Sequence, residues 1–141
     1  MYVAIRIRGG INVKKDVKET LAFLNLPKIN NCVLIPEKPT FEGMLRKAKN
    51  MITWGEIKQE QLEKLLRKRA LLQGDKKLTD AQAKEFAEKI LKGESPKNLG
   101  FKVPLRLSPP SGGYVSTRNS YPKGDLGYRG DKINELLEKF V

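Results

Sequence analysis

The chain has 141 residues, of which 39% are hydrophobic and 31% charged, so it can form one domain or a compact core with appendages. Its formal net charge of +12, from 28 Lys and Arg against 16 Asp and Glu, indicates a polyanionic partner such as RNA, DNA or an acidic membrane surface. No run of about eighteen apolar residues is present, which excludes a transmembrane helix, while a single cysteine and no histidine exclude an internal disulfide, the usual zinc sites and histidine-based catalysis.

The N-terminal residues 2–8 alternate between apolar and other side chains. Val3 and Ile5 fall on one face, and Arg6 and Arg8 fall on the other, which predicts a strand that ends at the following glycines. The same two arginines interrupt the apolar run, so we expect no signal peptide here. Together with the single cysteine, this favours a cytoplasmic protein.

The first 57 residues continue this strand with helical and strand patterns in turn. Apolar spacing predicts a helix that ends before Pro27, a buried strand at 32–35, a second helix over 40–51 and a third strand at 51–57. Thr40 is placed as the N-cap of the second helix. The pattern is β-α-β-α-β, and we expect its helices to cover one face of a three-stranded sheet, which leaves the opposite face or an edge free.

Residues 58–93 have a different, helical pattern. It predicts a hairpin of two helices, the first ending at Gly74, and the second opening with a capping box of Thr79 and Gln82. Its buried stripe is expected to reach Leu91. Residues 94–141 contain an extended basic segment and a last amphipathic helix at 130–141, whose slight negative charge favours packing on the core or against protein.

No catalytic constellation is visible in the sequence. The stretch SPPSGGYVSTRN lacks the spacing of a phosphate-binding loop. Glu56, Glu60 and Glu63 are best interpreted as a solvated surface, while Cys32 and Trp54 fit core positions. We therefore expect no enzyme activity, no cofactor, no metal and no small-molecule substrate.

The Gly- and Pro-rich segment 104–130 is the main candidate for contact with RNA. Its cations neutralise phosphates, its hydroxyls bond phosphate and sugar, its tyrosines stack on bases, and its glycines allow close approach. The candidate RNA-binding residues in it are Arg106, Ser108, Ser111, Gly112, Gly113, Tyr114, Arg118, Lys123 and Arg129. The alternative is an ordinary surface loop with scattered charge, although loops of this length are uncommon without a function.

Two further groups of cations lie in the β-α-β-α-β region. The first comprises Arg6, Arg8, Lys14 and Lys15, whose alternative role is the protection of an edge strand by charge. The second lies on the second helix and comprises Arg46, Lys47 and Lys49, whose alternative is a solvated helix face. Gly43, in the same helix, costs about 1 kcal/mol against Ala, so close packing or close approach of RNA is its expected reason.

Several motifs together resemble the large-subunit ribosomal protein family known as L30 in bacteria and archaea and L7 in eukaryotes. They are RIRGG, LNLPKINNCVLIP, FEGMLRKAKNMITWGEI, LRLSPPSGGY and KGDLGYRGDKINELLEKF, in this order along the whole chain. The resemblance implies an α+β fold with a ferredoxin-like core, plus an insertion and a C-terminal extension that short bacterial members lack. It also implies a structural role on large-subunit ribosomal RNA, near 5S RNA, among neighbouring ribosomal proteins.

Carried over to this chain, the resemblance implies RNA-facing positions in three places. They are Arg6, Arg8 and Gly9 at the strand end, Gly43, Arg46 and Lys47 on the second helix, and residues 106–113 in the extension. Ser111 departs from the pattern, because members often carry a basic residue there, and it keeps only a hydrogen-bonding role. The remaining alternatives are an independent RNA-binding, RNA-chaperone or chromatin protein, and an enzyme acting on phosphate compounds.

Overall fold

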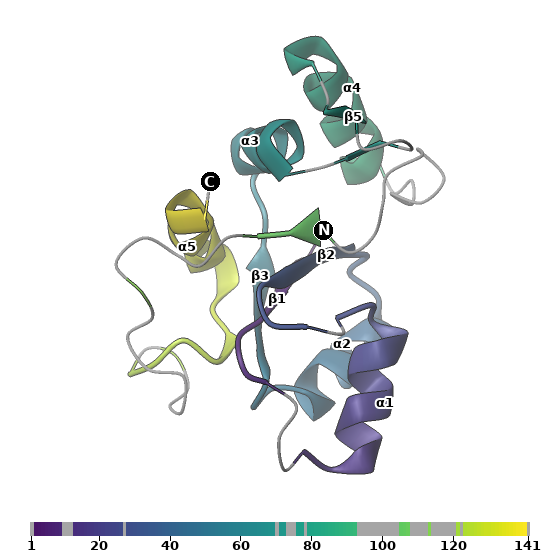
Figure 1. The fold of residues 1–141 in the computed structure, drawn as a ribbon, viewed down its shortest axis with the longest axis vertical. Helices are drawn as coiled ribbons and strands as arrows, with labels where there is room; N and C mark the ends of the chain where they lie inside the picture. The colour runs from purple at the N-terminus through teal and green to yellow at the C-terminus, as the bar shows by residue number, and fades with distance from the viewer. Residues whose placement is uncertain are drawn as a thin grey trace.

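The computed structural model describes residues 2–9, 13–26, 28–69, 71–72, 76–77, 79–92, 105–107, 113, 121 and 123–140 (Figure 1). Its elements follow the chain in this order: β1 (Tyr2–Arg6), α1 (Lys15–Phe23), β2 (Asn31–Ile35), α2 (Pro39–Lys47), β3 (Ile52–Glu56), α3 (Gln59–Arg69), β4 (Leu71–Leu72), β5 (Lys76–Lys77), α4 (Asp80–Leu91), β6 (Leu105–Arg106), β7 (Gly127–Tyr128), the 3-10 turn η2 (Gly130–Lys132) and α5 (Ile133–Phe140). The predicted α+β class and its β-α-β-α-β core are confirmed.

The central sheet has five strands in the order β6-β2-β1-β3-β7. β1 lies in the middle and is antiparallel to both neighbours, with Ala4 opposite Val33 on β2 and Trp54 on β3. The expectation of three strands was wrong, because the C-terminal segment adds a strand at each edge. β6 pairs antiparallel with β2, and β7 pairs parallel with β3. Each added strand is two residues long, too short to show a periodic pattern.

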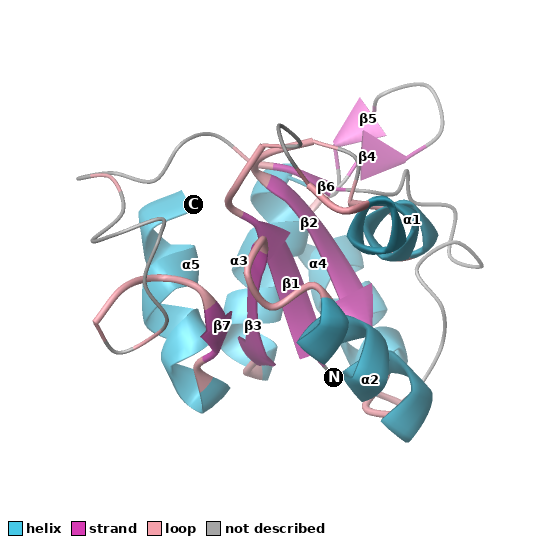
Figure 2. Cartoon of the chain, turned by 90° about the horizontal axis from the view of Figure 1, so that it is seen from below, coloured by secondary structure: helices cyan, strands magenta, loops and turns pink. Residues whose placement is uncertain are grey.

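Helices cover both faces of this sheet, as Figure 2 shows from below. The face of Tyr2 and Ala4 packs against apolar residues of α1 and α2, while the face of Val3 and Ile5 packs against residues of α3, α4 and α5. The alternation of residues 2–5 therefore assigned each side chain to its correct face. The face that the β-α-β-α-β pattern left free is covered by the later helices.

Four local predictions about the helices were wrong. The second helix, expected to reach residue 51, ends at Lys47. The N-cap of α2 is Lys38 rather than Thr40, and Pro39 follows as the first helical residue, where its fixed φ is already helical and its missing N–H costs no hydrogen bond. α3 ends at Arg69 instead of Gly74, because β4 and β5 pair in the connection. Leu91 is 38% exposed and so lies outside the buried stripe of α4.

The capping box at the start of α4 was predicted correctly. The Gln82 N–H donates to the Thr79 hydroxyl at 3.3 Å, and the Thr79 N–H donates to the Gln82 side-chain oxygen at 3.2 Å. These two bonds satisfy backbone donors that the first turn of a helix leaves without partners. The expected burial of Cys32 and Trp54 is also confirmed, and burial raises the pKa of the Cys32 thiol well above its usual range.

The C-terminal segment docks on β3 through close backbone contact. The Arg129 N–H donates to the Trp54 carbonyl at 3.0 Å, and the Thr53 hydroxyl donates to the Gly127 carbonyl at 2.9 Å. Gly55 makes this approach possible, because a Cβ there would overlap the Gly130 carbonyl oxygen. The fold thus needs glycine at position 55 for packing within the protein.

Candidate nucleic-acid interface

Three cation-bearing segments meet at one end of the sheet, which we call the cationic end. The pairing of Arg6 with Ile52 shows that β1 ends there and β3 begins there. The pairing of Asn31 with Arg106 shows that β2 begins and β6 ends at the same place. The β1–α1 connection, the end of α2 and the end of β6 are therefore neighbours in space although they are far apart in sequence.

Four of the predicted site residues line one hollow at this end. Arg8, Gly9, Lys14 and Lys47 surround a space of about 340 Å³. The backbone of β1 is fixed beside it, because the N–H groups of residues 7 and 8 both donate to the Met51 carbonyl, at 2.9 and 3.2 Å. The three cations are exposed, so an anion can reach them. A hollow lined by three exposed cations is a candidate site for a phosphate group.

The exposed face of α2 extends this surface. Gly43, Arg46 and Lys47 are all exposed, and their spacing of three and four residues places them on one side of the helix. A Cβ on Gly43 would meet nothing within 4 Å, so packing within the described protein does not require glycine here. Of the two reasons that the sequence suggested for glycine at position 43, close packing and close approach of RNA, only the second remains. The two cations also lie in the last turn, where they interact favourably with the helix dipole.

Arg106 brings the C-terminal segment to the cationic end. Its side chain is exposed on the edge strand β6. Asn30 connects this strand to β1, because its N–H donates to the Arg6 carbonyl at 2.8 Å and its carbonyl accepts from the Leu107 N–H at 2.9 Å. The structure thus places Arg106 at the same end of the sheet as Arg8, with β2 between their strands.

The structure adds residues that the sequence did not single out. Asn50 lines the hollow with Lys47. Lys28 is exposed in the turn before β2, and its neighbour Ile29 lies 3.5 Å from the place where a Cβ on Gly9 would sit. Neither Lys28 nor Asn50 belongs to a charged run, so only the folded arrangement identifies them.

Two arginines from the predicted set have partners inside the protein. Arg6 is 6% exposed and donates to the carbonyls of Leu26 and Arg8 at 2.8 and 2.9 Å, and burial lowers its pKa. Arg129 is 9% exposed and forms an ion pair with Asp125 at 3.1 Å. Contact of these two residues with RNA stays a prediction, but the geometry gives both guanidinium groups a structural role.

The other predicted residues are distributed as follows. Lys15 is exposed at the start of α1 and lies 4.0 Å from the Glu19 carboxylate, and Lys123 is exposed before β7. Gly113 is exposed with φ at +72°, a conformation that suits glycine. Ser108, Ser111, Gly112, Tyr114 and Arg118 lie outside the described residues, so their roles stay predictions.

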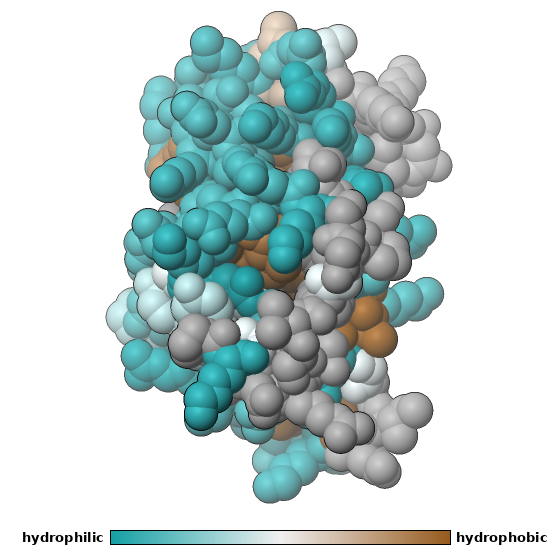
Figure 3. All heavy atoms as spheres, turned by 90° about the vertical axis from the view of Figure 1, so that its left-hand side faces the viewer, coloured by the Kyte–Doolittle hydropathy of each residue, from teal (hydrophilic) through white to brown (hydrophobic). Residues whose placement is uncertain are grey.

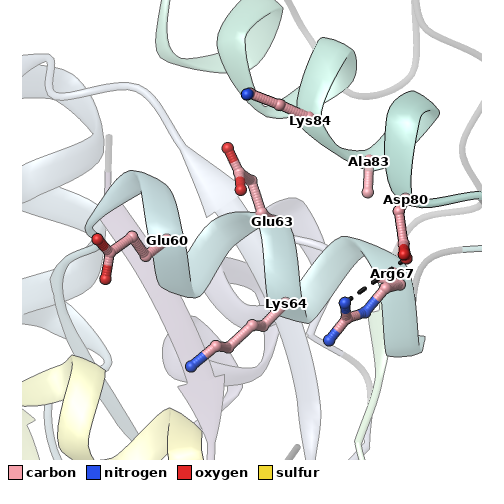
Figure 4. A pocket seen from close by; sticks show the side chains of 7 residues that line it. All are labelled: Glu60, Glu63, Lys64, Arg67, Asp80, Ala83 and Lys84. Carbon is pink, nitrogen blue, oxygen red and sulfur yellow. Dashed lines mark ion pairs between the residues drawn. The ribbon is translucent and has the colours of Figure 1, made fainter.

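A second hollow, of about 370 Å³, lies between α3 and α4 (Figure 4). Glu60 and Glu63 were expected on a solvated surface, and the structure places them in its wall with side chains of both signs. Arg67 and Asp80 form an ion pair of 3.5 Å across it. Among the described residues, no group of three His, Cys, Asp or Glu side chains could hold a metal ion. In the same part of the chain, no helix is long and apolar enough to cross a membrane.

Comparisons with known proteins give a consistent result. The sequence pattern of the family described as ribosomal protein L30p/L7e matches residues 2–52. A protein of Methanosphaera stadtmanae named large ribosomal subunit protein uL30 is 43% identical, with 100% of both chains covered. Proteins of the same name from Archaeoglobus fulgidus and Thermoplasma acidophilum are 41% and 39% identical, and the matches cover 99% and 100% of this chain and 99% and 93% of theirs.

Proposed function

The chain belongs to the ribosomal protein L30p/L7e family, and on that premise we propose that it is a structural constituent of the large ribosomal subunit that binds ribosomal RNA at the cationic end of its sheet. Proteins of this family are structural and not enzymes. The corresponding location is the ribosome in the cytoplasm. The mixed-charge hollow between α3 and α4 therefore needs no catalytic role.

The observation that carries the proposal is the convergence of six exposed cations from separate segments. They are Arg8, Lys14, Lys15, Arg46, Lys47 and Arg106. Folding does not require like charges to gather, because their mutual repulsion opposes it. A phosphate backbone that follows the end of the sheet would neutralise all six and release its condensed counterions.

Two finer points extend this proposal. Residues 108–120 follow Arg106 along the chain, so we propose that their hydroxyls, glycines and Tyr114 continue the contact across sugar and phosphate. The bound RNA would include a region near 5S RNA. Cross-linking from these positions in assembled subunits, read at single-nucleotide resolution, tests both points.

The central test is the salt dependence of binding to a large-subunit ribosomal RNA transcript. If six phosphates are neutralised, the logarithm of affinity should fall with the logarithm of salt concentration at a slope near −4. Arg8→Ala should lower affinity and reduce the magnitude of the slope by about 0.7. Lys139→Ala, which removes an exposed cation from α5, is the matched control and should change neither quantity.

Two results would reject the proposal. A salt slope near zero would exclude phosphate neutralisation as the binding mechanism. Equal effects of Arg8→Ala and Lys139→Ala would show that the cationic end has no special role. Sucrose-gradient sedimentation separates the ribosomal role from that of an independent RNA chaperone, since only a structural constituent tracks the large subunit in a fixed ratio.

A further inference from the structure

An acidic surface lies away from the cationic end, where β3 ends and where α3 and α5 begin. It comprises Glu56, Glu60, Asp131, Glu135 and Glu138, all exposed, and we call it the acidic strip. Most of it lines a third hollow, of about 250 Å³, together with Lys58, Gln61, Lys132 and Asn134. In a chain with a net charge of +12, this concentration of carboxylates stands apart from the surface proposed for RNA.

The acidic strip is a built surface because Asn134 connects its three segments. The side-chain amide of Asn134 donates to the carbonyls of Glu56 and Asp131 at 3.1 and 2.8 Å, and its oxygen accepts from the Lys58 N–H at 2.9 Å. Asn134 itself is 6% exposed. These bonds fix the end of β3, the start of α3 and the start of α5 relative to one another. On the side of the molecule that carries α5, most of the described residues in view are hydrophilic (Figure 3).

Gln61 supplies a second and independent sign of a ligand. It is 7% exposed and lines the same hollow. Its side-chain N–H donates to the Glu138 carboxylate at 3.0 Å, which fixes the orientation of the amide, because a carboxylate cannot donate in return. The amide oxygen is buried and accepts no hydrogen bond. Buried acceptors in native proteins are nearly always satisfied, so this oxygen, on a residue that lines the hollow, lacks a donor.

The chemistry of the surface selects a cationic polypeptide as the occupant. The carboxylates repel phosphates, which excludes nucleic acid, and no cluster in the described residues is suited to a metal ion. Lys132 already pairs with Glu135 at 3.4 Å, but the hollow holds four carboxylates against two lysines, and Lys and Arg side chains of a partner supply further positive charge and N–H donors. The ring of Tyr128 is 50% exposed beside Glu56, to which its hydroxyl donates at 3.2 Å, and it offers a face for a cation.

We propose that the acidic strip is a docking surface for a Lys- and Arg-rich segment of another polypeptide. The identification of that polypeptide as a neighbouring protein of the large subunit rests on the proposed function. The binding of a cationic segment does not rest on it, so each can fail separately. The protein would then hold RNA at one end of its sheet and a basic protein segment at the other.

The first test uses the full chain and a fluorescent nona-arginine peptide at low ionic strength. Saturable binding of one peptide per protein chain is expected, since the net positive charge of the chain opposes binding of a cation elsewhere on its surface. The double variant Glu135→Lys and Glu138→Lys should weaken affinity at least about tenfold, because each reversal replaces an attraction by a repulsion. Glu85→Lys with Glu88→Lys on α4 is the matched control, with the same spacing and the same charge change, and should alter affinity less than about twofold.

Gln61→Met tests the missing donor separately from charge. It should weaken peptide binding severalfold while the midpoint of thermal unfolding changes little, because removal of a buried unsatisfied oxygen offsets the loss of the hydrogen bond to Glu138. Absence of saturable binding, or equal losses in the two double variants, would overturn the proposal. RNA binding measured on the same variants should be unchanged, and its loss would instead point to the acidic strip as part of the RNA surface.

Discussion

The buried ion pair between Asp125 and Arg129 offers the sharpest test of the structure. The nitrogen and oxygen atoms lie 3.1 Å apart, and the two side chains are only 6% and 7% exposed. Arg129 also donates to the Thr53 hydroxyl at 2.9 Å and to the Asp125 carbonyl at 2.8 Å, and its guanidinium lies 5.1 Å from the centre of the Tyr121 ring. Asp125→Ala removes the only carboxylate that pairs with this guanidinium in the described structure.

The expected cost of Asp125→Ala is about 3 kcal/mol in the free energy of unfolding. Breaking a buried pair from one side costs about 3–5 kcal/mol, because it leaves an uncompensated buried charge. The low end applies here, since the hydroxyl, the carbonyl and the aromatic ring remain as partners of Arg129. The double variant with Arg129→Met should be at least about 1 kcal/mol more stable than Asp125→Ala alone, because it buries neither charge.

Urea denaturation of the wild type, both single variants and the double variant measures these values. The reasoning is refuted if Asp125→Ala costs less than about 1 kcal/mol or if the two changes are additive. RNA binding by the folded fraction supplies the second measurement. Arg129→Met should keep the salt slope of the wild type, and a loss of about 0.7 in its magnitude would return Arg129 to the RNA interface.

Three further predictions concern glycine and tyrosine. Gly55→Ala should destabilise the fold by about 2 kcal/mol or more in urea denaturation, because its Cβ would strike the rigid carbonyl of Gly130. Gly43→Ala should stabilise by about 0.5–1 kcal/mol in the same assay and yet weaken RNA binding, and unchanged affinity would contradict close approach of RNA. The hydrogen bond to Glu42 raises the pKa of Tyr2 to about 12 in the folded protein, against about 10 in the unfolded chain. The protonated Tyr2 hydroxyl therefore stabilises the fold fully below about pH 10, and this stabilisation is lost as the pH rises toward 12. Between about pH 9 and about pH 11, the free energy of unfolding of Tyr2→Phe should therefore fall less than that of the wild type. An equal fall in the two proteins would refute this cause.

The sequence predicted the central strands well and the edge strands not at all. Alternation in residues 2–5 has a simple physical basis, since each side chain of β1 enters one of two cores. β7 has no comparable signal, because its two residues are held by partners more than seventy positions earlier, such as Thr53 opposite Gly127. Pairing over such a distance depends on the folded whole, so local patterns do not reveal it.

The candidate site shows the same division. Residue type was enough to select Arg8, Lys14 and Lys47, but their arrangement around one hollow required the fold. Arg6 was predicted to contact RNA because it shares a strand face with Arg8, and the structure shows that it is buried and donates to the Leu26 carbonyl. Charge patterns record which side chains are basic, and they carry no information about what covers them.

The origin of the two edge strands has a consequence for synthesis. Both edges of the sheet are closed by residues of the C-terminal segment, at 105–106 and 127–128, whereas β3 is complete at Glu56. When only β1 to β3 of a nascent chain have emerged from the ribosome, the partial sheet therefore has two open strand edges and one uncovered apolar face until the rest is translated. Early release, truncation or slow translation within this interval should favour edge-to-edge association of nascent chains, and a chaperone that shields strand edges should suppress it.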